Sequence, residues 1–424
     1  MSINRRNVLI TGAAILGAAL TTSRRASAAA QTTLKIATPN SSYKKMLDEL
    51  AAKFSAANPN VGVEFIGKGD NWDPLLQFTL REGLIGDLPD GTWQSLTYAS
   101  LLAQRGYAQP LNGAAGGAGA FSELGLSNTL LESVSAGSDV YAMPFGTTVP
   151  VIYYNMDLLR RVGYPAANPP AKWEEIFDLG AKISALDKKL TGGFIEYEAT
   201  NAWIFQNLLA TFGGRMMTPD LKAVAFDSPA GLQALNVLWR FGDISSTEMT
   251  RDQARQAFNA GTSGIHVRSA SGTTSVAKSA TGQFELQVGQ LPLSSSAGRM
   301  VGAGHGFMMF TKDEARQKAM WDFTRFAAGP EGQMILAKNT GYMPINMLAL
   351  EQPEFLKEYL EINPYHKAIV DSLAITSDQF SFPSDNTVKI ADMMAEEMRQ
   401  VAVHQTKPEK ALVHMAEQTK KLLG

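Results

Sequence analysis

The sequence predicts an α/β protein of two domains, and three observations lead to that prediction. The chain has 424 residues, and a mature chain of about 395 residues is longer than one hydrophobic core normally serves. The first segments after residue 30 alternate strand, helix and strand, which is the repeating unit of a parallel sheet. Apolar residues make up 45% of the chain, which is ordinary for a globular protein with a packed interior.

The first unit of this pattern covers residues 32–67. TTLKIATPN, residues 32–40, predicts a strand that ends in a polar turn. YKKMLDELAAKFSAANP, residues 43–59, has apolar residues at helical spacing, and Asn58 and Pro59 end that helix. VGVEFIG, residues 61–67, alternates as a second strand. A crossover helix between two strands implies that the strands are parallel.

The elements further along the chain are predicted from the same periodicities. KGDNWDP, residues 68–74, looks like a loop, and DPLLQFTLREGLIG, residues 73–86, is helical. GAAGGAGA, residues 113–120, reads as a flexible surface loop. VPVIYYN, residues 149–155, is a strongly β-type run, and MDLLRRVG, residues 156–163, is a short helix closed by glycine. Further helices are expected at 173–186, 200–212, 229–241, 313–328 and 387–403.

The N-terminal residues 1–30 have the features of an export signal. Arg5 and Arg6 precede the uncharged run Val8–Leu20, which is too short to cross a bilayer, and ASAAAQ offers a site to signal peptidase. Adjacent arginines before a mildly apolar run are typical of the twin-arginine route, while an ordinary Sec signal is the alternative. The segment predicts a periplasmic protein.

Composition excludes several other classes. The chain has no cysteine, so it has no lipoprotein anchor, no disulfide and no thiolate metal site. Removal of the four arginines of residues 1–30 changes the formal net charge from −2 to −6, which argues against a nucleic-acid partner. No stretch after residue 30 approaches the 18 or so apolar residues that a membrane span needs.

Signatures of the common catalytic sites are missing. There is no G-x-S-x-G, no H-E-x-x-H and no G-x-x-x-x-G-K-[ST]. GAGHGF, residues 302–307, is followed by MMF, which continues a strand instead of opening a dinucleotide-binding helix. The five histidines lack ligand-type spacing, so we expect neither a metal nor a cofactor.

Aromatic residues recur instead beside small hydroxyl and amide residues at predicted loop ends. A polyhydroxylated solute is held by such a combination, because a ring covers its C–H face while hydroxyls, amides and backbone N–H groups bond its oxygens. Each cluster alone is a weak signal. The clusters are GDNWD, GTWQSLTY, PFGTTVP, EATNAW, RSASGTT and TGYMPIN.

Five longer stretches, taken together, carry a resemblance to a known family. They are MPFGTTVPVIYYNMDLLRRVGY, NPPAKWEEIFDLGAKI, WIFQNLLATFGGRMM, FDSPAGLQALNVL and GPEGQMILAKNTGYMPIN. In this order they resemble the extracellular solute-binding proteins of ABC importers, family 1, which includes sugar and glycerol-3-phosphate binders.

The resemblance implies a two-lobe periplasmic binding protein fold of type II, with a ligand cleft between lobes joined by a hinge. One lobe is expected to take residues 31–145 plus 300–340, and the other residues 146–299 plus 341–424. A solute would close the lobes, and the closed form would dock on permease subunits at the inner membrane.

The resemblance also implies a set of ligand-binding residues. Glycerol-3-phosphate binders have an arginine in the C-terminal helix, where this chain has Ala391, and that departure favours a neutral sugar. Arg268 keeps an anionic solute open, because guanidinium suits phosphate, sulfonate and carboxylate. The ligand-binding residues expected from the family are Trp72, Gln94, Ser95, Gly146, Thr147, Thr148, Trp203, Arg268, Ser271, Gly304, His305 and Tyr342.

The function that follows is a monomeric periplasmic receptor that captures a carbohydrate or sugar derivative and performs no catalysis. A binder of an anionic glycerol-phosphate-like or sulfonated sugar solute is the first alternative. An exported glycosidase or lyase is a second, and a sensor subunit that reports to a membrane kinase or chemoreceptor is a third.

Overall fold

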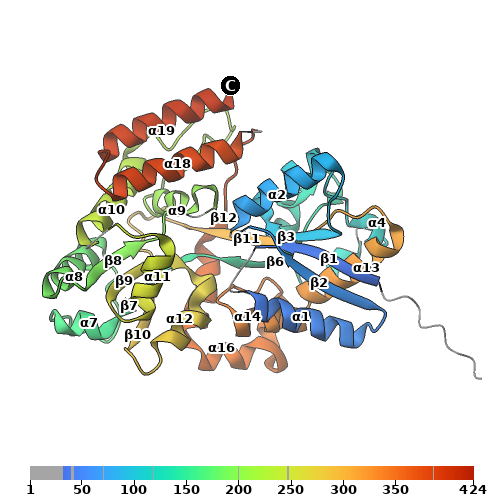
Figure 1. Ribbon diagram of the computed structural model, residues 1–424, viewed down its shortest axis with the longest axis horizontal. Coiled ribbons are helices and arrows are strands. Elements are labelled where there is room, and N and C mark those ends of the chain that lie inside the picture. Colours follow the sequence, from blue (N-terminus) through green and yellow to red (C-terminus); the bar gives the residue numbers. More distant parts are fainter. Residues whose placement is uncertain are drawn as a thin grey trace, which may run out of the picture.

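A computed structural model describes residues 32–424 except 40–42, 70, 118, 199, 246–247 and 385, and it builds them around two large β-sheets (Figure 1). The predicted export signal lies outside the described residues. Helices cover both sheets, so the architecture is α/β. Within the part of the chain that is described, no helix combines the length and the apolar character needed to cross a membrane.

The first sheet has the strand order β12-β11-β3-β1-β2, and β6 pairs with β11. β1 pairs in parallel with β2 and β3, as the crossover pattern predicts, whereas β11 runs antiparallel to β3 and β6. Its strands are β1 (Thr32–Thr38), β2 (Val61–Gly67), β3 (Gly91–Ser95), β6 (Met143–Thr148), β11 (Met300–Met309) and β12 (Thr376–Asp378).

The second sheet has the order β10-β7-β9-β8. β7 is antiparallel to both of its neighbours, and β8 is parallel to β9. Its strands are β7 (Pro150–Asn155), β8 (Thr191–Ile195), β9 (Ser263–Ser269) and β10 (Leu286–Gln290), and a separate small hairpin pairs β4 (Ser135–Ala136) with β5 (Asp139–Val140).

The α-helices fall into three groups along the chain. Those before β7 are α1 (Lys44–Ala57), α2 (Trp72–Ile85), α3 (Ala99–Gln104), α4 (Asn112–Ala115), α5 (Gly119–Ser122) and α6 (Asn128–Glu132). Those between β7 and β11 are α7 (Met156–Arg161), α8 (Trp173–Leu186), α9 (Trp203–Thr211), α10 (Pro229–Ile244), α11 (Arg251–Asn259) and α12 (Thr273–Ala280). Those after β11 are α13 (Glu314–Ala328), α14 (Pro330–Asn339), α15 (Met347–Glu351), α16 (Glu358–Ile362), α17 (Pro364–Asp371), α18 (Thr387–Ala402) and α19 (Pro408–Leu423).

Two local predictions are wrong. The segment before residue 75 is not a loop throughout, because α2 already begins at Trp72. Pro74 fits the first turn of a helix, where its missing N–H has no partner to lose. The glycine-rich segment 113–120 contains parts of α4 and α5, and Gly116 and Gly117 adopt positive φ between them.

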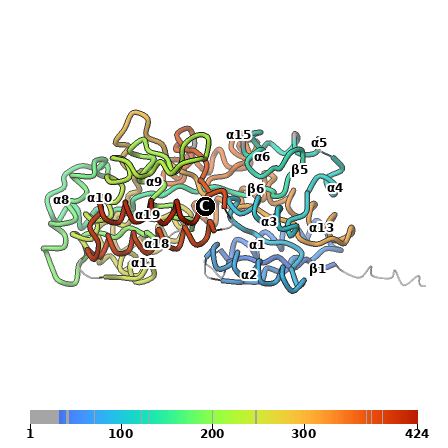
Figure 2. Tube along the Cα trace, turned by 90° about the horizontal axis from the view of Figure 1, so that it is seen from above, coloured from blue at the N-terminus to red at the C-terminus, as the bar shows by residue number. Residues whose placement is uncertain are grey.

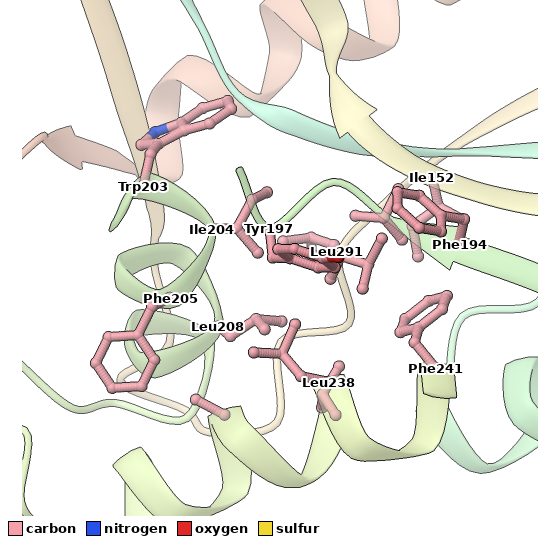
Figure 3. Packing of buried hydrophobic residues seen from close by; sticks show 14 of the residues in the cluster. Ile152, Phe194, Tyr197, Trp203, Ile204, Phe205, Leu208, Leu238, Phe241 and Leu291 are labelled. Atoms are coloured by element: carbon pink, nitrogen blue, oxygen red, sulfur yellow. The ribbon is translucent and has the colours of Figure 1, made fainter. Parts of the chain in front are cut away.

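Each sheet has its own hydrophobic core. The core of the first sheet includes Leu34, Trp93 and Phe307. The core of the second includes Ile152, Phe205 and Leu238, and Figure 3 shows the rings and aliphatic chains of α9, α10 and β8 packed there. We call the two units the first-sheet body and the second-sheet body.

Two strands connect the bodies. β6 belongs to the first sheet, and after the single residue Val149 the chain continues as β7 of the second sheet. β11 contributes Met300 to the second core and Phe307 to the first. Figure 1 shows β6 and β11 between the two bodies, and Figure 2 shows the two bodies from above. The predicted lobe boundaries at residues 145 and 300 fall within β6 and at the start of β11, and they stay a prediction.

Candidate functional site

A cavity of about 100 Å³ lies between the two bodies. Tyr43, Trp72 and Ser95 line it from the first body, and Glu196 and Arg255 line it from the second. A second cavity of about 320 Å³ continues from it and shares Tyr43, Trp72, Arg255 and other lining residues. We call the two together the cleft. A concave site lined from two bodies is the usual place for a small ligand.

The wall of the cleft on the first body is aromatic. The ring of Trp72 stacks on that of His305, with centroids 4.0 Å apart and planes tilted by 30°. Trp93 meets Trp72 edge-on at 5.0 Å, and Tyr43 and Tyr342 continue the cluster. Burial lowers the pKa of His305 to about 3, so its imidazole is neutral at physiological pH. This wall offers apolar faces without charge.

A chain of hydroxyl groups lies across the junction of the two bodies. The hydroxyls of Thr148 and Ser269 are 3.0 Å apart, and Ser269 donates to Ser271 over 2.8 Å. The backbone N–H of Ser271 donates to the hydroxyl of Thr148, and the hydroxyls of Ser271 and Tyr43 are 3.0 Å apart. Tyr43 belongs to the first body, so this chain joins both walls.

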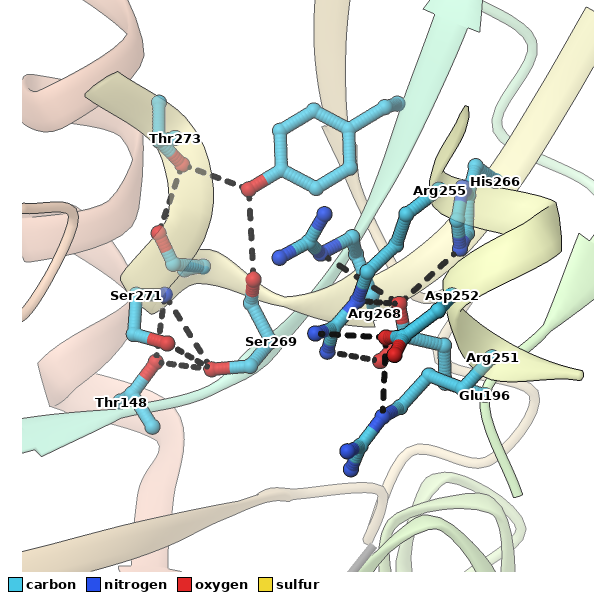
Figure 4. A network of polar contacts seen from close by, with 12 residues as sticks. Thr148, Glu196, Arg251, Asp252, Arg255, His266, Arg268, Ser269, Ser271 and Thr273 are labelled. Carbon is cyan, nitrogen blue, oxygen red and sulfur yellow. Dashed lines mark hydrogen bonds and ion pairs between the residues drawn. The ribbon is translucent and has the colours of Figure 1, made fainter. Parts of the chain in front are cut away.

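The wall on the second body is charged, and Glu196 is at its centre (Figure 4). Arg255 donates two hydrogen bonds to this buried carboxylate, from Nε to Oε1 over 2.7 Å and from Nη2 to Oε2 over 2.6 Å. The His266 Nε2 atom lies 3.1 Å from Oε1, and the Arg268 Nε atom lies 3.5 Å from the same oxygen. Burial alone would raise the pKa of Glu196, but Arg268, His266 and Arg255 together hold it well below its ordinary value.

The predicted site residues fall into three groups. Residues of the first group line the smaller cavity, and Arg268 lines the larger one. Residues of the second group lie on the other face of β6 and β11, where they line a separate cavity. Residues of the third group are buried away from any of these cavities. The first group is Trp72, Ser95, Thr148, Trp203, Ser271, His305 and Tyr342, the second is Thr147 and Gly304, and the third is Gln94 and Gly146.

Strand geometry explains the second group. Successive side chains of a strand point to opposite faces, and paired residues on adjacent strands share a face. Thr148 pairs with Ala303 on the cleft side, so Thr147 and its partner Gly304 face away from the cleft. The turn-like appearance of PFGTTVP in the sequence hides this alternation.

Packing explains the third group. The Gln94 side chain is fully buried, and its Oε1 accepts the backbone N–H of Ser95. A Cβ on Gly146 would come within 2.7 Å of Cδ2 of Leu336, so glycine lets the Leu336 side chain pack closely against β6. Trp203 of the first group lines the cleft, but its indole N–H is already engaged by the carbonyl of Val301 over 2.8 Å. Only its ring is free to meet a ligand.

The helix α18, near the C-terminus, contains the position at which the resemblance predicts an arginine in glycerol-3-phosphate binders. Ala391 is buried, whereas Lys389 is exposed. Arg399 is paired with Glu396 and Glu248 on the protein surface. Among the described residues, no group of histidine and acidic side chains is arranged to hold a metal ion.

Sequence reasoning missed Tyr43, Glu196, Arg251 and Arg255. Arg251 and Arg255 are four residues apart on α11, which places both on one helix face. That spacing was visible in the sequence, but its partner Glu196 is distant along the chain, directly after β8. The position of Glu196 directly after an apolar strand is the one signal that could have indicated a buried charge.

The sequence profile of the bacterial extracellular solute-binding proteins matches residues 49–362. The chain therefore belongs to that family, and it is a binding protein rather than an enzyme. The family is extracellular by its description, and the curated relatives are named periplasmic, which confirms the predicted location outside the cytoplasm.

The curated relatives include sn-glycerol-3-phosphate-binding periplasmic proteins named UgpB. That of Agrobacterium fabrum is 27% identical over 233 residues, which is 50% of this chain and 50% of the relative. That of Escherichia coli K12 is 24% identical over 330 residues, 72% of each chain. The match thus spans about half the length of the first of these relatives and nearly three quarters of the second.

Solved structures confirm the two-lobe binding-protein fold. UgpB from Mycobacterium tuberculosis, in complex with glycerophosphocholine, matches with a TM-score of 0.79 at 20% identity, over 92% of this chain and 98% of that one. Maltose-bound MalE3 of T. maritima matches with a TM-score of 0.76 at 19% identity, over 92% of this chain and 100% of that one.

Proposed function

We propose that this protein is the periplasmic receptor of an ABC importer, that it captures a carbohydrate or sugar derivative in the cleft, and that it delivers the solute to permease subunits. The observation that carries the proposal is the composition of the cleft. Rings line one side and hydrogen-bonding groups the other, which is the combination that a polyhydroxylated solute requires.

The two bodies act in this proposal as the lobes of a hinge. β6 and β11 are the crossing strands, and closure brings the aromatic wall and the charged wall onto one solute. The names of similar proteins support a solute of this class. Maltose is bound by one of them and D-mannitol by another, and glycerophosphocholine is bound by the mycobacterial UgpB.

A thermal-shift screen with sugars, polyols and their phosphorylated or sulfonated derivatives tests the proposal. A true ligand at 100 times its Kd stabilises the folded state by about 2.7 kcal/mol, and we expect small-angle scattering to show a smaller radius of gyration with that ligand bound. A complete screen without a saturable shift would contradict the proposal. Recovery of the ligand unchanged after incubation separates binding from hydrolysis.

We also propose that residues 1–30 direct export by the twin-arginine route. Replacement of Arg5 and Arg6 by lysine is expected to leave precursor in the cytoplasm, since that pathway requires the arginine pair. A normal periplasmic yield of this double variant would instead favour the Sec route.

A further inference from the structure

Three arginines surround the larger part of the cleft. Arg251 and Arg255 come from α11, and Arg268 comes from the end of β9 (Figure 4). The side chain of Arg251 is 23% exposed and that of Arg268 is 13% exposed. Guanidinium groups held this deeply interact with a ligand charge more strongly than surface arginines do, because water screens them less.

Around these arginines, one carboxylate is buried and two lie at the exposed rim of the cleft. Glu196 is the buried one, and it is fully occupied by Arg255, His266 and Arg268. Asp252 is 77% exposed and stays 4.0 Å from Arg251 and 3.8 Å from Arg255. Glu198 is an exposed residue at the edge of the smaller cavity. Exposed pairs at such distances contribute little, so the depth of the cleft retains a positive excess.

Two of the arginines also have unmet hydrogen-bond donors. Within the described part of the chain, the Nε atoms of Arg251 and Arg268 are buried and make no hydrogen bond, because Asp252 at 4.0 Å and Glu196 at 3.5 Å are ion-pair partners without hydrogen-bond geometry. Leaving a buried charged donor unpaired is costly. An oxyanion on a ligand supplies the acceptors that the protein itself does not provide, and guanidinium binds it in a fork geometry.

The glycine at position 272 supports the same interpretation. A Cβ on Gly272 would lie 2.5 Å from Nη2 of Arg268, so glycine leaves room for the guanidinium against the start of α12. The neighbouring hydroxyls of Ser269 and Ser271 extend from this point towards the aromatic wall. Charge and hydroxyl groups are therefore continuous along one surface of the cleft.

We infer that Arg251 and Arg268 form an anion subsite, and that the solute is an acidic sugar or polyol derivative whose carboxylate, phosphate or sulfonate lies against this wall. The inference rests on the proposed function, and it replaces the neutral sugar favoured by the sequence. The anion is held by α11 and β9 of the second-sheet body instead of the C-terminal helix.

Inorganic phosphate and matched sugar pairs test this inference on the mature protein. Thermal shift and calorimetry would compare glucose with glucuronate and glucose 6-phosphate, in wild type, Arg251→Met, Arg251→Lys and Arg325→Met. Arg325 is a matched control because it lies on α13 with its side chain 59% exposed. Arg251 is preferred to Arg268 for substitution, because Arg268 also neutralises Glu196 and its loss risks misfolding.

We expect phosphate to give a saturable shift with the wild type and with Arg325→Met, and none with Arg251→Met. The anionic sugars should bind more tightly than glucose, and Arg251→Met should weaken them by about 10- to 100-fold, the range of a charge-assisted hydrogen bond. Arg251→Lys should recover part of that loss, because it restores the charge without the fork.

Two results would overturn the inference. If glucose binds as tightly as its anionic forms, the cleft is a neutral-sugar site and the proposed function stands without the anion subsite. If phosphate gives no saturable shift and Arg251→Met binds the anionic sugars normally, the arginines are structural. Absence of binding by every solute of the complete thermal-shift screen would contradict the proposed function as well.

Discussion

Two carboxyl groups, the buried Glu196 of the second-sheet body and the partly buried Asp73 of the first-sheet body, have pKa values shifted in opposite directions. Glu196 in the second-sheet body is surrounded by guanidinium groups, and its pKa is held below the ordinary value despite burial. Asp73 in the first-sheet body accepts a hydrogen bond from the phenol of Tyr98 and has Asp392 as its charged neighbour. Burial raises the pKa of Asp73 to about 6. The pKa of each carboxyl is thus decided by its surroundings, since burial dominates at Asp73 whereas cationic and hydrogen-bonding neighbours outweigh burial at Glu196.

The largest effect is expected from Glu196→Gln, which removes the charge at the centre of the second wall. Arg255 and Arg268 then lose their buried counterion, and breaking such a pair typically costs about 3–5 kcal/mol. Urea unfolding of this variant and of Glu198→Gln, an exposed neighbour, measures the difference. The wild-type contribution of Glu196 is present above its ordinary pKa of 4.5 and declines as the pH falls below that value. Equal stability of both variants would show that the cluster contributes nothing net.

Trp72→Ala tests the aromatic wall. Because Trp72 is 7% exposed and stacks on His305, we expect a loss of about 2–4 kcal/mol in the free energy of unfolding, in contrast to the minor fold role expected of a loop residue. Trp72→Phe keeps a ring and should retain most of the stability. Binding of a confirmed ligand by both variants then separates stacking from folding. If Trp72→Ala is as stable as the wild type, Trp72 contributes to ligand binding and not to folding.

The variant Asp73→Asn tests the comparison of the two carboxyl groups through the pH dependence of the free energy of unfolding. The pKa of Asp73 rises from 3.8 to about 6 on folding, so protonation stabilises the native state. This contribution is complete below pH 3.8 and is lost as the pH rises through about 6, in total about 3 kcal/mol.

The asparagine variant is therefore expected to show a flatter dependence of unfolding free energy between about pH 4 and pH 7. Asp87→Asn is the control, because Asp87 is exposed on the loop after α2. Parallel profiles for wild type and Asp73→Asn would mean that the carboxyl keeps its ordinary pKa.

The smallest effects are expected at two adjacent threonines of β6. Thr148→Val removes hydrogen bonds to Ser269 and Ser271 at the boundary of the walls, which should weaken ligand binding by about 1 kcal/mol. Thr147→Val acts on the opposite face of the strand and should leave affinity unchanged. Calorimetry with the ligand identified by screening compares them. Equal losses would mean that both faces of the strand contribute to binding.

The elements with a single strong periodicity could be predicted from the sequence. Residues 43–57 are such a case, since their buried positions recur at helical spacing, and the run of β-type residues at 149–155 identifies a strand that is buried throughout. The walls of the cleft were only partly predictable. Glu196 and Arg255 meet across 59 residues of chain, and Tyr43 meets Ser271 across 228. No local pattern contains those pairings, and the face on which Thr147 lies depends on the register of β6 against β11.

The strand β11, which completes the first sheet and also packs in the second core, has a consequence for synthesis of the chain. During synthesis, β3 is complete before its partner β11, which emerges roughly 200 residues later. Closing so long a loop slows folding. Until β11 has been synthesised, the nascent chain exposes β1, β2 and β3 with an unpaired edge, and this state is prone to aggregation. An export route that accepts only folded protein would give this chain time to complete β11 before it leaves the cytoplasm.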